Sequence, residues 1–254
     1  QLPLGHPTDI NSIEWWLAFQ ADRMIAPTRF LVEQLVIGFE LDVDHIAHIP
    51  NGIDPSLWRP TGAVTAPLRR RDPLVVSWGR VQYEKGFQVL ARAIHALRGR
   101  VPDVHGVIAG RGSYLPELQT QIDVEGVSDL IELPGFVADV ELRHLVHRAG
   151  CVVIPSLYEP FGIVALEALA AGAPLIVART GGLAERVGGT HASVTFEPGN
   201  PDDLADAIEQ VLMNDELATI LVANARDLVE RKYAWGAIAR ATAEVYASAR
   251  ITAR

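Results

Sequence analysis

From residue 73 onward, short apolar runs alternate with longer segments in which apolar residues recur every three or four positions. The short runs predict buried strands, and the longer periodic segments predict amphipathic helices. The predicted strands span 74–79, 104–110, 130–135, 151–156, 174–179 and 193–198. The predicted helices span 87–98, 114–126, 139–150, 162–172 and 201–213. This alternation is typical of βαβ units, so we predict an α/β fold: a Rossmann-like parallel sheet with helices on both faces.

Residues 1–60 follow a less regular pattern that resembles the tail of another α/β unit. The predicted elements are a helix at 12–21, a short strand at 23–27, a helix at 29–39 and a strand at 45–50. A link rich in Pro, Gly and Arg follows at 59–73, and its basic run at 69–71 is predicted to be solvated. The last predicted helix, 235–250, is amphipathic and therefore needs a surface to pack against.

Composition narrows the class of protein. The 254 residues are 49% hydrophobic, enough for a real core in one large domain or two modest ones. A formal net charge of −9 argues against a nucleic-acid-binding protein, which needs a basic face. The apolar run 161–177 is shorter than the roughly 20 residues that cross a bilayer, and we recognise no signal peptide.

Cysteine use bears on the compartment. The sequence has one cysteine, Cys151, so it cannot form an intramolecular disulfide. Cys151 opens an apolar predicted strand, and we expect it to be a small core residue. A reducing cytoplasm is the simplest compartment, with peripheral attachment to the inner membrane face as the alternative.

Two glutamates frame the segment "EPFGIVALEALAAG". Glu159 precedes the predicted helix, and Glu167 is the one charged residue in the apolar run 161–177. A helix rises ~1.5 Å per residue, so both carboxylates can reach one ligand that lies along the helix start. The free N–H groups there also favour an anion. The alternative is a loop carboxylate and a glutamate that reaches solvent, and spacing alone leaves both open.

Basic residues follow the first strand of the predicted sheet, in "SWGRVQYEKG". Arg80 offers a planar fork for phosphate and Lys85 a point charge. Ligands of open parallel sheets bind beyond the carboxyl ends of the strands, so these side chains suggest an anion site; exposed surface charges are the alternative. Glycine-bearing loops at 109–113 and 180–185 also follow strands. Neither GxxxxGK[ST] nor a full GxGxxG occurs, which argues against hydride transfer with a dinucleotide.

Three sets of residues superficially suggest a metal site. "DVD" at 42–44 resembles the paired aspartates of metal-dependent sugar transferases, and "DHIAH" at 44–48 and the pair His144 and His147 have ligand-like spacings. The aspartates precede a strand, far from the other loops, and no further ligand completes either histidine set. We therefore predict no metal and no cofactor.

Taken together, these motifs resemble glycosyltransferase family 4, whose members have the GT-B fold. Its Glu-x7-Glu hallmark corresponds to Glu159 and Glu167, with the Pro-Phe-Gly loop after the first glutamate. The family's "GR…KG" element corresponds to Gly79, Arg80, Lys85 and Gly86. The resemblance also covers "IPNGID" at 49–54 and the "GG…E" loop, and it extends over about residues 12 to 246.

The resemblance implies a role for each matching residue. Arg80 and Lys85 would hold the diphosphate of a nucleotide-sugar donor, and Glu159 would bond hydroxyls of the transferred sugar; these are the implied catalytic residues. Glu167 would bond the ribose. The implied donor-binding set is completed by residues that contact phosphate, sugar or base through the backbone or at strand ends: Gly79, Gly110, Phe136, Val137, Phe161, Gly162 and Ile163. The family retains anomeric configuration and uses no metal.

At finer resolution, "SIEWWLAFQADRMIAPT" and "YEPFGIVALEALAAGAPL" are similar to actinobacterial glycogen-synthase-like α-1,4-glucosyltransferases, including the type that elongates methylglucose lipopolysaccharide. This implies polysaccharide biosynthesis, with glucose passed to a growing α-glucan. The alternatives are a mannosyltransferase acting on a lipid acceptor and a nucleotide-sugar-binding module without activity. Trp15 and Trp16 could stack on sugar, but their helical spacing favours a core between domains.

The chain departs from the family pattern in two ways. The resemblance implies an amino-terminal GT-B domain that supplies most of the acceptor site, and we expect most of that domain to lie outside this sequence. We therefore predict a remnant of that domain at 1–60, a nucleotide-sugar-binding domain at 61–234 and a crossover helix at 235–254. Arg111 stands where the family commonly has an acidic or small residue.

Overall fold

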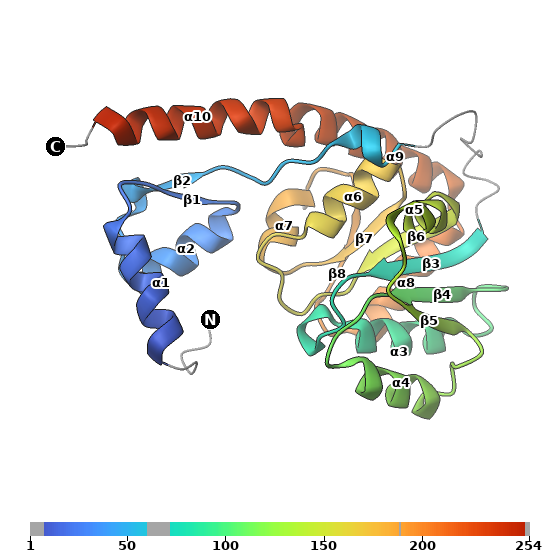
Figure 1. Cartoon of the computed structure of the whole chain (residues 1–254). Coiled ribbons are helices and arrows are strands. Elements are labelled where there is room, and N and C mark those ends of the chain that lie inside the picture. The colour runs from blue at the N-terminus through green and yellow to red at the C-terminus, as the bar shows by residue number, and fades with distance from the viewer. Residues whose placement is uncertain (1–7, 60–71, 188, 252–254) are drawn as a thin grey trace.

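The structure is a computed structural model that describes residues 8–59, 72–187 and 189–251. Within these residues, six parallel strands form a central sheet in the order β5-β4-β3-β6-β7-β8 (Figure 1). The strands are β3 (Asp72–Trp78), β4 (His105–Ala109), β5 (Ile131–Gly135), β6 (Ala149–Ile154), β7 (Leu175–Ala178) and β8 (Val194–Phe196). Strand order reverses between β3 and β6, as in a doubly wound Rossmann sheet. The predicted fold class is confirmed.

Helices cover both faces of the central sheet. One face packs against α3 (Phe87–Leu97), α4 (Leu115–Val124) and α8 (Pro201–Leu212). The other packs against α5 (Asp139–Arg148), α6 (Ile163–Ala171) and α7 (Gly181–Val187). Helix α9 (Asp215–Leu228) packs against α6 and α8.

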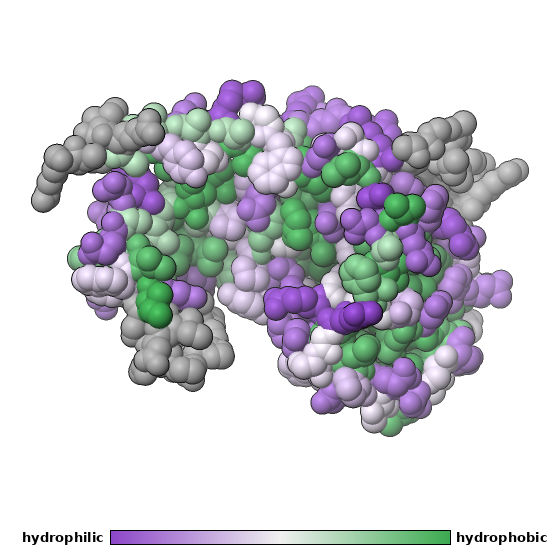
Figure 2. Space-filling model, viewed as in Figure 1, coloured by the Kyte–Doolittle hydropathy of each residue, from purple (hydrophilic) through white to green (hydrophobic). Residues whose placement is uncertain are grey.

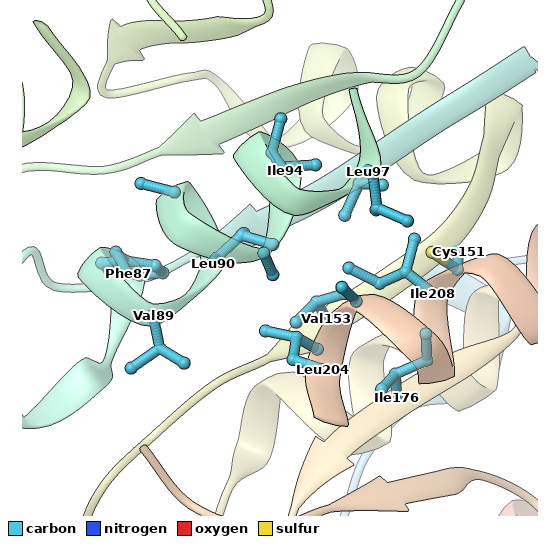
Figure 3. Close-up of a cluster of buried hydrophobic side chains, with 14 of the residues drawn as sticks. Phe87, Val89, Leu90, Ile94, Leu97, Cys151, Val153, Ile176, Leu204 and Ile208 are labelled. Atoms are coloured by element: carbon cyan, nitrogen blue, oxygen red, sulfur yellow. The ribbon is translucent and has the colours of Figure 1, made fainter. Parts of the chain in front are cut away.

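Alternation along each strand divides its side chains between two cores. Val75 of β3 belongs to the cluster under α3 and α8, whereas its neighbours Leu74 and Val76 belong to the cluster under α6. This follows from the two-residue side-chain period of a strand. Figure 3 shows the first cluster, in which side chains of α3, β6, β7 and α8 converge. Cys151 lies in it, fully buried, as predicted, and burial raises the pKa of its thiol to about 12.

The N-terminal residues form a smaller group of elements. Helix α1 (Thr8–Gln20), strand β1 (Met24–Ala26), helix α2 (Arg29–Phe39) and strand β2 (Ile46–His48) follow the predicted order. β1 and β2 pair in parallel, apart from the central sheet. The predicted solvated run at 69–71 and most of the link around it lie outside the described residues. The predicted domain boundaries stay predictions.

The C-terminal helix α10 (Trp235–Ile251) extends from the central sheet's unit toward the N-terminal elements (Figure 1). It follows a π-helical turn, η5 (Val229–Tyr233), whose last carbonyl accepts a hydrogen bond of 2.8 Å from the Ile53 amide. Figure 2 shows the molecule hollowed below α10, with hydrophobic side chains at the surface of the hollow. No helix in the described ranges has the length and apolar character needed to span a membrane.

Two segments differ from the sequence-based prediction. The stretch 180–185, predicted as a glycine-bearing loop, contains the start of α7, since Gly181 and Gly182 lie in its first turn. Their presence suggested a loop because glycine weakens helices. Helix α9 was not predicted, although Asn214 caps it by accepting a hydrogen bond of 2.9 Å from the Leu217 amide.

The tryptophan pair of α1 is not buried by the described residues. Trp15 and Trp16 are 39% and 55% exposed, and both stack with Phe19. The indole of Trp15 donates a hydrogen bond of 3.2 Å to the Phe39 carbonyl. The predicted core between domains is therefore not formed within the described part of the chain.

The two-core packing predicts a sharp difference between two isoleucines. Ile94 of α3 is fully buried, whereas Ile220 of α9 is 48% exposed. Ile94→Ala should lower the free energy of unfolding by about 2–5 kcal/mol, because it removes buried methyl groups and leaves a cavity. The matched control Ile220→Ala should change it by about 0.5 kcal/mol. Urea denaturation of both variants checks this, and equal losses would contradict the assigned packing.

Candidate functional site

A cavity of about 250 Å³ lies at the carboxyl ends of β3 and β6. These are the strands between which the sheet order reverses, and this is where open α/β sheets bind ligands. Its walls come from the end of β3, the loop to α3, the loop after β6 and the start of α6. The lining residues are Ser77, Trp78, Gly79, Arg80, Lys85, Phe87, Ile154, Pro155, Ser156, Glu159, Ile163 and Val164.

The loop after β3 is tied directly to the loop after β6. Gly86 adopts φ +70°, and a Cβ atom there would lie 1.8 Å from the carbonyl oxygen of Pro155. Only glycine permits that approach. The Leu157 amide also donates a hydrogen bond of 2.8 Å to the Glu84 carbonyl. These contacts place Lys85 opposite the residues that follow β6.

Lys85 and Glu159 form an ion pair in the cavity, with Lys85 Nζ 2.7 Å from Glu159 Oε2. Their side chains are only 19% and 13% exposed. The Ser156 hydroxyl donates a longer hydrogen bond of 3.3 Å to the same oxygen. An ammonium group has three N–H donors, so Lys85 can hold Glu159 and an anionic ligand together. Arg80 lines the same cavity with an exposed side chain.

The start of α6 supplies the third wall. Gly162 is the residue before the helix, in a left-handed conformation with φ 84°, and Ile163 opens the helix and lines the cavity. The first amides of a helix lack intrahelical partners and carry its positive dipole end. This wall therefore favours an anionic group near Lys85. Phe161 is buried rather than facing the cavity, and its carbonyl accepts a hydrogen bond from within the protein.

Glu167 is not a lining residue of the cavity, but it contacts Trp78, which is one. The Trp78 indole donates a hydrogen bond of 3.1 Å to Glu167 Oε2. Burial raises the pKa of the Glu167 carboxyl, the Trp78 bond lowers it, and Asp139 adds to the rise. Trp78 also stacks on Trp58, with ring centroids 6.0 Å apart. The carboxylate thus stands at the edge of a low-dielectric region, with one oxygen oriented by an aromatic donor.

Several predicted site residues do not line this cavity. Gly110, at the end of β4, donates a backbone hydrogen bond of 2.7 Å to Gly135. Phe136 is 66% exposed and has the Arg111 guanidinium 5.7 Å from its ring centre, while Val137 is half-buried beside it. They lie at the next two strand ends, so they would extend the site along the edge of the sheet.

Two of the residues set aside as metal decoys make structural hydrogen bonds. Asp42 caps a short 3₁₀ helix by accepting a hydrogen bond of 3.0 Å from the Asp44 amide. His147 Nε2 bonds the Trp58 carbonyl at 2.7 Å. Among the described residues, no cluster of three or more His, Cys, Asp or Glu side chains could hold a metal ion. That the protein works without metal stays a prediction.

Comparison with protein-family profiles gives a match over most of the central unit. A family profile described as "Glycosyl transferases group 1" matches residues 65–228. This range contains all the residues that line the cavity, and Glu167 as well.

Similar proteins carry related names. The chain is 34% identical over 248 residues to an uncharacterized glycosyltransferase of Methanocaldococcus jannaschii, covering 93% of this chain and 63% of the relative. It is 34% identical over 242 residues to a glycogen synthase of Mycobacterium tuberculosis, covering 95% and 58%. The chain thus spans about six tenths of the length of these relatives.

The fold has a close counterpart among solved structures. The crystal structure of Anabaena Alr3699/HepE in complex with UDP and glucose matches with a TM-score of 0.85, at 24% identity, covering 96% of this chain and 68% of that one. Such a match at this identity establishes the fold alone. Since the match covers 96% of this chain, it includes the N-terminal elements as well as the central sheet.

The surroundings of Glu167 predict a pH-dependent gain of stability on removing its charge. A carboxyl whose pKa is higher in the folded than in the unfolded state destabilises the fold once it ionises, above its ordinary value of 4.5. Glu167→Gln should therefore raise the free energy of unfolding at pH 7 and leave it unchanged at pH 4. Urea denaturation at both pH values measures this.

The control for that experiment is Glu244→Gln on the exposed face of α10. It should change the free energy of unfolding little at either pH. A gain for Glu167→Gln that is the same at both pH values would show that burial does not disfavour the ionised carboxylate.

Proposed function

Because this chain belongs to the family of glycosyl transferases group 1, we propose that it forms the donor-binding half of a retaining, metal-independent glycosyltransferase. The observation that carries the proposal is the ion pair of Lys85 and Glu159 in the cavity where the sheet order reverses. A nucleotide sugar needs a cation for its diphosphate and a hydrogen-bonding group for its hydroxyls. This cavity presents both side by side.

In this proposal the residues divide the donor among them. Arg80, Lys85 and the first amides of α6 hold the diphosphate and stabilise the charge that develops on it as the sugar departs. Glu159 accepts hydrogen bonds from hydroxyls of the transferred sugar. Glu167, oriented by Trp78, bonds the ribose. This role gives a reason for a carboxylate at a position where burial disfavours its ionised form. Gly110, Phe136 and Val137 edge the base at the neighbouring strand ends.

For the finer activity, we propose transfer of glucose to a growing α-glucan. The similarity to a glycogen synthase supports this assignment. The glucan acceptor would bind against an amino-terminal domain, which would face the donor cavity described above. A preference for GDP-mannose would instead favour the mannosyltransferase reading.

Calorimetric titration with ADP-glucose, UDP-glucose and GDP-mannose tests the donor site. Lys85→Ala should weaken binding of the preferred nucleotide sugar and of its nucleoside diphosphate by about 10- to 100-fold, because a charge-assisted hydrogen bond is lost. Lys232→Ala is the matched control, since Lys232 is the other lysine of the sequence and is exposed in η5. Unchanged binding by Lys85→Ala would remove the phosphate role.

Glu159→Ala separates the sugar contact from the phosphate contact. It should weaken the nucleotide sugar by about tenfold and leave the nucleoside diphosphate bound at least as well, because Lys85 is released from its carboxylate partner. Equal losses for both ligands would contradict a sugar contact at Glu159.

Metal independence has a direct test. EDTA added to the titrations, beside buffer with added Mg²⁺, should leave donor affinity unchanged, because the cations that face the diphosphate are side chains. A loss of affinity with EDTA that Mg²⁺ restores would contradict the proposal and direct attention to the aspartates at 42–44.

A further inference from the structure

The loop between β6 and α6 is held at three successive carbonyl oxygens. The carbonyl of Glu159 accepts a hydrogen bond of 2.8 Å from the Gly182 amide of α7. The carbonyl of Pro160 accepts one of 2.9 Å from the Thr28 hydroxyl. The carbonyl of Phe161 accepts one of 3.1 Å from Arg186 Nε. The loop that carries the candidate sugar-binding carboxylate is thus fixed at three consecutive residues by groups that lie outside it.

Arg186 is a buried cation with partners in three parts of the chain. Arg186 is only 3% exposed. It donates to the carbonyl of Pro27 as well as that of Phe161. Its guanidinium lies 3.3 Å from the centre of the Phe161 ring and 5.3 Å from that of Tyr233. A buried charge is tolerated when carbonyl dipoles and aromatic faces replace its hydration, so this arrangement orders all three segments together.

Thr28 makes the second contact from the N-terminal elements. Its side chain is fully buried, and its hydroxyl accepts a hydrogen bond of 3.0 Å from the Leu31 amide while it donates to Pro160. It therefore caps α2 and at the same time fixes the loop between β6 and α6. Gly182 permits the approach, because a Cβ atom there would lie 2.3 Å from the Pro160 oxygen and 2.8 Å from Thr28 Cγ2.

We propose that Arg186 and Thr28 are positioning residues, through which residues 27–28 of the N-terminal elements set the place of the Glu159 carboxylate. Neither side chain lines the cavity, so both act through the backbone at 159–161. The inference rests on the proposed function, since it assigns these residues to sugar binding by Glu159. A merely structural role would change stability and leave ligand selectivity intact.

The test measures, for each variant, the affinity for the nucleotide sugar that the wild-type chain prefers and for its nucleoside diphosphate. Thr28→Val removes the hydroxyl at nearly constant shape, Thr28→Ser keeps it, and Arg186→Gln removes the charge. Thr28→Val and Arg186→Gln should weaken the nucleotide sugar by about fivefold or more relative to the diphosphate, the scale of one hydrogen bond. Thr28→Ser should behave like the wild type. The control is Arg179→Gln, at an exposed arginine paired with Glu197.

Combination with Glu159→Ala makes the result specific. If the residues act through Glu159, adding Thr28→Val to Glu159→Ala should lower the affinity for the nucleotide sugar no further. Additive losses would overturn the inference, and so would wild-type selectivity in Thr28→Val and Arg186→Gln. Thr28→Val carries the test even if Arg186→Gln does not fold.

The failure of the proposed function is a different result. It would appear as nucleotide-sugar binding by the wild-type chain that does not depend on Glu159, or as no binding at all. Amide hydrogen exchange at 157–163 then decides the inference without a ligand. Faster exchange in Thr28→Val than in Thr28→Ser would support the hold on the loop, and equal exchange would overturn it.

Discussion

The pairing of β3 with β6 is the constraint on which the rest of the molecule depends. These strands lie side by side in parallel, with Val75 opposite Cys151 and Val76 opposite Val152. The buried hydroxyl of Ser77 adds a hydrogen bond of 2.7 Å to the carbonyl of Val153. Because the chain leaves β3 toward β4 and leaves β6 toward β7, the two following loops diverge and open a cavity between them. The chemistry of the cavity follows from what those two loops carry.

The course of the central sheet could be predicted because each strand is a compact apolar run and each crossover helix is amphipathic. The exceptions have local causes. Helix α7 is short and begins with two glycines, which on propensity alone favour a loop; contact with the loop at Glu159 and Pro160 keeps them helical instead. Tertiary contact thus overrode the local signal at the place where the loop between β6 and α6 is held.

The sequence allowed us to predict where the site residues lie, but not which of them bond one another. Residues at strand ends could be expected to converge, and Arg80, Lys85 and Glu159 do line one cavity. The direct bond between Lys85 and Glu159, 74 positions apart, depends on the loop geometry at Gly86. Trp78 lies at the same strand end as Arg80, and this position could have indicated that Trp78 is a site residue. Arg186 and Thr28 carry no such signal, because their role depends on backbone carbonyls that no residue pattern reveals.

Thr28 contacts the loop between β6 and α6, and Pro27 contacts Arg186 of α7, so the N-terminal elements and the central unit are joined by more than the covalent link between them. A protein engineer who exchanged domains at the link around residues 60–71 would cut where the chain passes from the N-terminal elements to the central sheet. The hydrogen bonds from Thr28 to Pro160 and from Arg186 to Pro27 cross that cut. In a chimera joined there, residues 27–28 would come from one parent and the loop that carries Glu159 from the other. A unit that keeps these contacts therefore includes residues 27–28 together with α7, and a crossover point that preserves them lies upstream of β1.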